Sequence, residues 1–161
     1  VWLLELALCV GVWWPWGPLR RIGTAQRLQL AVTGLLAASA VSLVKSFSLT
    51  SCPWDLQDFG GIARHLSHWQ AQPDGGPGRC FPAGHASAGF GFLGGYFAFR
   101  DAAPAVARLW LAGALAMGLV LGLAQQWRGA HFLSHTLWSG WLCWVVALGV
   151  DRASRALRSS V

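Results

Sequence analysis

Residues 28–47 read LQLAVTGLLAASAVSLVKSF, and no charged residue lies between Arg27 and Lys45. A helix that crosses the hydrocarbon core of a bilayer needs roughly 17–25 mostly apolar residues, so this stretch predicts a membrane span. Further apolar stretches of comparable length predict spans at about 84–99, 106–126 and 130–150. The chain is therefore expected to cross a membrane several times.

A fifth apolar stretch, residues 2–16, opens the chain and carries Glu5. We interpret it as the end of a spanning helix whose beginning is missing, because the sequence starts with Val rather than Met. A signal peptide is the alternative, but the stretch has neither a basic n-region nor a small-residue cleavage site. The 161 residues are 55% hydrophobic and 11% charged, whereas soluble domains carry about 25% charged residues. The predicted fold class is a single all-α domain, a polytopic transmembrane helical bundle.

The net charge of +6 follows the predicted topology and does not form a nucleic-acid patch. Most of the basic residues flank the spans on one side of the membrane, and these are Arg20, Arg21, Arg27, Arg100, Arg108, Arg152, Arg155 and Arg158. The positive-inside rule assigns that side to the cytoplasm. We therefore expect no nucleic-acid partner, and we expect residues 46–83 to form a long segment on the outer side.

This outer segment is rich in Gly and Pro, notably in residues 73–78, and is predicted to be mostly loop. Cys52 and Cys80 lie near its two ends. If the outer side is an oxidising compartment, a disulfide between them would tie the second span to the third. Two reduced, buried thiols are the alternative.

Polar residues concentrate in three short clusters at the predicted outer ends of the spans: residues 45–55, 80–87 and 128–135. In the middle cluster Pro82 favours a helix start, and Gly84 lets the backbone approach a ligand closely. The first turn of a helix offers unpaired N–H groups to an anion, and His85 lies there. Lys45 and Arg128 would add two cations to this pocket. The pattern indicates a phosphate site, with His131 as nucleophile and His85 as proton donor to the leaving oxygen.

The three clusters resemble the signature of the type 2 phosphatidic acid phosphatase and vanadium haloperoxidase superfamily, which is K-x6-R-P, P-S-G-H and S-R-x5-H-x3-D. The matching residues run from Lys45 to Cys52-Pro53, then through Pro82-Ala83-Gly84-His85, and then from His131 to His135. The resemblance covers about residues 30–145 and is closest to a bacterial membrane-bound branch. It implies an all-helical bundle in which His131 attacks phosphorus to form a phosphohistidine and His85 protonates the leaving group. It also implies that Lys45 and the backbone at Ala83 and Gly84 hold the phosphate oxygens.

The sequence departs from this signature at four places. Cys52 replaces the first Arg, Ala83 replaces the Ser, Ala124-Gln125 stands where Ser-Arg is expected, and His135 replaces the Asp that orients the nucleophile. Arg128, about one helical turn from the expected Arg, is the predicted substitute cation. His135 lies four residues after His131, on the same helix face, and is predicted to accept a hydrogen bond from it.

The sequence thus predicts an integral membrane phosphatase that hydrolyses a phosphomonoester or diphosphate of an amphipathic lipid. The resemblance and the topology together imply the bacterial inner membrane, with the active site facing the periplasm. A lipid phosphotransferase that uses the same site is one alternative, and a catalytically inactive lipid-binding or assembly protein is another. The His and Cys residues show no close-set ligand spacing, so no metal site and no cofactor is predicted.

Overall fold

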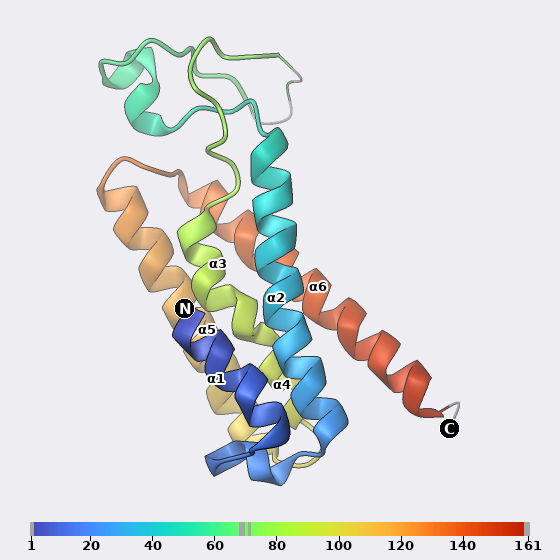
Figure 1. The fold of residues 1–161 in the computed structure, drawn as a ribbon. Helices are drawn as coiled ribbons and strands as arrows, with labels where there is room; N and C mark the ends of the chain where they lie inside the picture. The colour runs from blue at the N-terminus through green and yellow to red at the C-terminus, as the bar shows by residue number, and fades with distance from the viewer. Residues whose placement is uncertain (1, 68–69, 71, 160–161) are drawn as a thin grey trace.

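The computed structural model describes residues 2–67, 70 and 72–159 of the chain. These residues form a bundle of α-helices and short 3-10 helices (Figure 1). The α-helices are α1 (Trp2–Trp13), α2 (Thr24–Phe47), α3 (Gly84–Phe90), α4 (Gly94–Phe99), α5 (Pro104–Trp127) and α6 (Leu133–Ser159). The 3-10 helices are η1 (Gly17–Arg21), η2 (Pro53–Asp55), η3 (Gln57–Phe59) and η4 (Gly91–Leu93). No β-strand occurs in the described parts of the chain, so the all-α prediction is confirmed.

Helices α2, α5 and α6 are long and apolar enough, by length and composition, to cross a membrane. Each exposes large apolar side chains, for example Leu43 on α2, Val120 on α5 and Trp141 on α6. Such a surface suits a lipid environment, and the chain is an integral membrane protein. The predicted spans 28–47, 106–126 and 130–150 overlap these helices, but α2 begins at Thr24 and α6 continues to Ser159, so the helices extend beyond the apolar stretches. The predicted span 84–99 is divided into α3, η4 and α4, and the stretch 2–16 contains the shorter helix α1.

The centre of the bundle is the run from α3 through η4 to α4, which packs against α2, α5 and α6. Helix α1 packs against α2. Figure 1 shows the outer segment covering one end of the bundle, above the end of α2 and the start of α3, while η1 and the α4–α5 turn lie at the opposite end. This arrangement brings the end of α2, the start of α3 and the α5–α6 turn together beneath the outer segment.

At the opposite end, a buried ionic network joins three helices. The Asp151 carboxylate, which is 1% exposed, lies 2.6 Å from the Arg100 guanidinium and also contacts Arg155. It accepts a hydrogen bond of 3.1 Å from the side chain of Gln29 on α2. Buried charges are tolerated when they are paired and hydrogen-bonded in this way. The network therefore fixes α2, α4 and α6 relative to one another.

The outer segment is held by Asp74 and by the disulfide between Cys52 and Cys80, whose Cα atoms are 5.1 Å apart. The Asp74 carboxylate accepts hydrogen bonds from the N–H and hydroxyl of Ser51, at 2.6 and 2.8 Å, and from the Gly76 N–H at 2.9 Å. Burial raises the pKa of Asp74, but these hydrogen bonds outweigh it and leave the pKa below the usual value. A segment composed mostly of loop is thus anchored at the mouth of the bundle.

Helices α3 and α5 approach closely through glycine. A Cβ atom built at Gly89 would collide with the backbone of Met117 and Gly118 on α5, which cannot yield as a flexible side chain can. We therefore expect Gly89→Ala to destabilise the protein by about 1–3 kcal/mol. Thermal unfolding in detergent measures this effect. Gly113→Ala on α5 is the matched control because a Cβ there meets nothing within 4 Å; an equal loss in both variants would contradict the close packing.

Candidate functional site

A cavity of about 510 Å³ opens where the three polar clusters meet. Its polar end is lined by Lys45 from α2, Gly84 and His85 from the start of α3, and His131 from the α5–α6 turn. Its remaining lining includes Glu5, Gly34, Leu35, Ala38, Val41, Ser42, Cys52, Trp54, Ser87, Ala88, Gly91, Phe92, Gln125 and Ala130. Lys45 and His131, which are 86 positions apart in the sequence, therefore share one site.

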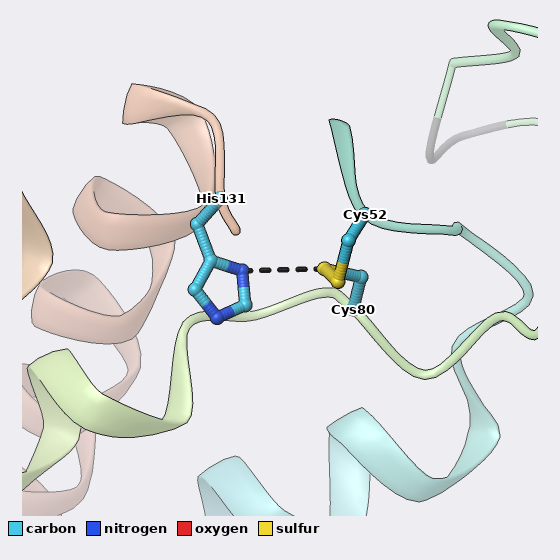
Figure 2. A group of neighbouring side chains, drawn as sticks. All are labelled: Cys52, Cys80 and His131. Atoms are coloured by element: carbon cyan, nitrogen blue, oxygen red, sulfur yellow. Dashed lines mark hydrogen bonds between the residues drawn. A yellow bond between two sulfur atoms is a disulfide. The ribbon is translucent and has the colours of Figure 1, made fainter. Parts of the chain in front are cut away.

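The His131 ring is buried, with 7% of the residue exposed. Its Nδ1 lies 3.3 Å from Nδ1 of His135 and 3.4 Å from Sγ of Cys80. Figure 2 shows Nδ1 of the ring facing the disulfide, whereas the other ring nitrogen does not face it. A disulfide sulfur carries no hydrogen and can only accept a hydrogen bond. The contacts of His131 Nδ1 with Cys80 and His135 are therefore most favourable when Nδ1 carries the ring proton and is the donor. Nε2 then keeps its lone pair, as a nucleophile requires.

Burial and, to a smaller extent, the nearby charges of Lys45 and His85 together lower the pKa of His131 from 6.5 to about 4. A ring with this pKa is neutral at pH 7, so its lone pair is available for attack. The positive charge of Lys45 in the same cavity thus helps to keep His131 unprotonated.

This pKa predicts the acid side of the pH–rate profile. Because the neutral ring is the reactive form, kcat/KM should fall as the pH drops through about 4. Lys45→Met should move this limb to higher pH, since it removes a cation that disfavours the imidazolium. Rates measured against pH with a soluble phosphomonoester test both points. If the acid limb of Lys45→Met lay at the same pH as that of the wild type, the charge of Lys45 would not lower the pKa of His131.

His135 is 1% exposed and reaches the cavity only through its contact with His131. Its backbone carbonyl accepts a hydrogen bond from the Ala83 N–H at 3.1 Å, which joins the start of α6 to the start of α3. Its side chain lines a second cavity, of about 580 Å³, beneath the outer segment. The structure therefore places His135 beside His131 and not in the lining of the first cavity.

Two predicted phosphate ligands lie outside the cavity lining. The Ala83 N–H donates a hydrogen bond to the His135 carbonyl, and the Ala83 carbonyl accepts one from the Ser139 hydroxyl at 2.8 Å. Both backbone polar groups of Ala83 therefore already have partners within the protein. Arg128 is exposed at the end of α5 and does not line the cavity. The chain turns at Gly129, where φ is +69°, directly after the helix ends. Gln125, at the position where the signature has Arg, lines the cavity instead.

Gly84 lies beside Lys45 in the cavity. A Cβ at this position would lie 3.8 Å from Cδ of Lys45, an ordinary van der Waals contact. The space around the residue therefore does not by itself require glycine. The Ser87 hydroxyl, also in the lining, donates a hydrogen bond to the Gly84 carbonyl at 2.7 Å.

The sequence did not predict two features of the site. Glu5 from α1 lines the cavity beside Gly34, and its Oε1 accepts no hydrogen bond from the residues that the structure describes. Cys52, Cys80 and His131 offer ligand atoms that all lie within 4.8 Å of one another. Motif spacing could not reveal this group, because its members are 28 and 51 residues apart in the sequence.

A family model described as the PAP2 superfamily matches residues 27–158. No curated protein and no solved structure matches the chain significantly. The matched region contains all three polar clusters and begins within the first turn of α2.

Proposed function

The chain belongs to the PAP2 superfamily, and from this premise we propose that it hydrolyses a phosphomonoester or diphosphate of an amphipathic lipid. The observation that carries the proposal is the single cavity in which His131, His85 and Lys45 meet. A neutral nucleophile, a second imidazole and a cation are the groups that phosphoryl transfer through a covalent intermediate needs.

In the proposed reaction, the lone pair of His131 Nε2 attacks phosphorus, and the bond from phosphorus to the leaving oxygen breaks. Lys45 offsets part of the negative charge on the phosphate oxygens, the Gln125 amide donates a hydrogen bond to one of them, and His85 gives its proton to the leaving oxygen. Water then attacks the phosphohistidine while His85 takes a proton from it, which releases phosphate and restores His131. The contact with His135 orients the His131 ring throughout.

The end of the cavity away from Lys45 supports a lipid as the substrate. Its lining is mostly apolar, with Leu35, Ala38 and Val41 of α2 and Ala88 and Phe92 of the central run, and it also includes Glu5. Gly34 and Lys45, which both line the cavity, are eleven residues apart on α2, or about 16 Å at the helical rise. An apolar chain can therefore lie along α2 while the phosphate stays beside Lys45. The positive-inside pattern supports a site on the outer face, and we propose the periplasmic face of a bacterial inner membrane.

Purified protein in detergent, tested on a panel of lipid phosphates, is the direct experiment. The panel should include phosphatidic acid, phosphatidylglycerol phosphate, an isoprenyl diphosphate and a short water-soluble phosphomonoester. We expect phosphate release from at least one lipid, at a higher kcat/KM than from the soluble ester. A phosphorylated acceptor lipid, formed in place of free phosphate, would identify a phosphotransferase. Absence of either product from every lipid would overturn the proposal.

The proton-donor role of His85 predicts a dependence on the leaving group. His85→Ala should slow cleavage of a lipid alkyl phosphate by about 10²–10⁴-fold, because an alkoxide leaves poorly without a proton. The same variant should retain much more of its activity toward p-nitrophenyl phosphate, whose leaving group needs little protonation. Parallel measurements of kcat/KM for the two substrates test the role. Equal losses on both would assign His85 to binding instead.

A further inference from the structure

The disulfide that anchors the outer segment lies against the proposed nucleophile (Figure 2). Sγ of Cys52, Sγ of Cys80 and Nδ1 of His131 lie within 4.8 Å of one another. Thiolate sulfur and imidazole nitrogen are ligands that Zn²⁺ prefers. While the disulfide is intact its sulfurs are not thiolates, so the question concerns the reduced protein.

The distances suit a tetrahedral ion. With Zn–S bonds of about 2.3 Å and Zn–N bonds of about 2.0–2.1 Å, the sulfur and nitrogen ligands of one zinc lie about 3.6 Å apart. The Cys80 Sγ and His131 Nδ1 atoms are 3.4 Å apart. Two thiolates on one zinc lie about 3.8 Å apart, so the sulfurs must separate by roughly 2 Å after reduction. Neither cysteine is in a helix, since Cys52 precedes η2 and Cys80 precedes α3, so modest side-chain rotation can supply this movement.

We propose that the reduced protein binds one Zn²⁺ through Cys52, Cys80 and His131, with the fourth position open to water. A dithiol reductant transfers two electrons and two protons to the disulfide, which gives two thiols and the oxidised reductant. Zinc binding then displaces the two thiol protons to solvent. Three protein ligands and one open position are a common arrangement for zinc.

The zinc would control the nucleophile, and this consequence rests on the proposed function. His131 binds the metal through Nδ1, so its one ring proton must move to Nε2. Nε2 is the atom that attacks phosphorus in the proposed reaction, and in this tautomer it has no free lone pair. The reduced, zinc-loaded protein is therefore inactive, whereas the disulfide form is active.

Cobalt serves as a spectroscopic probe for zinc and tests the site without an activity assay. Full-length protein in detergent is reduced with a phosphine, desalted and titrated with Co²⁺. We expect one equivalent to bind with the visible bands of tetrahedral cobalt and a near-ultraviolet thiolate charge-transfer band, both bleached by Zn²⁺. Unreduced protein should show neither. The same spectrum in unreduced protein, or none after reduction, would overturn the proposal.

Variants assign the ligands. The double variant Cys52→Ser with Cys80→Ser should lose the charge-transfer band. The matched control, Cys9→Ala with Cys143→Ala, removes the two free cysteines and should keep it. If a variant does not fold, alkylation of reduced wild-type protein gives the answer: Zn²⁺ should protect Cys52 and Cys80 but not Cys9. Equal alkylation of all three with and without zinc would contradict the site.

Activity is measured last, on the same samples. Zinc should abolish phosphate release by reduced protein, and a chelator should restore it, while unreduced protein is unaffected. If no lipid phosphate is hydrolysed in any state, the proposed function fails but the cobalt spectrum still decides the metal site. If zinc binds yet leaves activity unchanged, the capture of His131 is wrong.

Discussion

His131→Ala should reduce phosphate release by at least about 10³–10⁴-fold, because the variant has no group that can form the phosphohistidine. The effect should appear in kcat, since Lys45 and His85 still line the cavity and still bind the substrate. Initial rates of phosphate release from the best lipid of the panel measure it. A comparable thermal unfolding midpoint in detergent would show that the variant is folded.

His65→Ala is the matched control for this substitution. His65 stacks on Phe132, with ring centroids 5.5 Å apart, and lines the second cavity beneath the outer segment. The same chemical change there should leave kcat within a few-fold of the wild type. Near-normal turnover in His131→Ala, or equal losses in the two variants, would remove His131 from the reaction.

Lys45→Met should raise KM and the inhibition constant for vanadate by about 10–100-fold. A hydrogen bond to a charged group contributes about 1.5–3 kcal/mol, and methionine keeps most of the lysine stem while removing the charge. Lys45 is half-buried in the cavity, where water screens its charge less than at the surface. Steady-state kinetics with and without vanadate give both constants.

Arg128→Met is the matched control for this prediction. The sequence predicts Arg128 as a second phosphate cation, but its side chain is exposed and lies outside the cavity lining. We therefore expect less than about a threefold change in either constant, as for other exposed charges. A loss in Arg128→Met as large as that in Lys45→Met would mean that the α5–α6 turn closes over the bound phosphate.

The sequence predicts the bundle because a bilayer imposes a length and a composition that can be read residue by residue, as in the stretch up to Lys45. It also predicts that His85 and His131 share a site, since both belong to clusters at the outer ends of spans. Helix ends were harder to predict. Helix α6 continues through Asp151, whose charge marks the end of the apolar stretch, because Arg100 and Arg155 pair with it.

The finer assignments depended on side-chain direction, which sequence spacing does not determine. The sequence predicts Arg128 as the substitute cation because it lies about one helical turn from the motif position of Gln125, but α5 ends at Trp127 and, of the two, only Gln125 lines the cavity. Ala83 was assigned by its place in the motif, yet its N–H and carbonyl are bonded to α6. The contact between Cys80 and His131 joins residues 51 positions apart and follows only from the fold of the outer segment.

The most direct test of the account is to trap the phosphoryl group on the protein. Protein mixed with a radiolabelled lipid phosphate and quenched in alkali, which preserves phosphohistidine, is digested and mapped by mass spectrometry. The account predicts label on His131 alone, at Nε2, because Nδ1 faces Cys80 and His135. Rapid phosphate release with no label on the protein, or label at Nδ1 or on another residue, would contradict it.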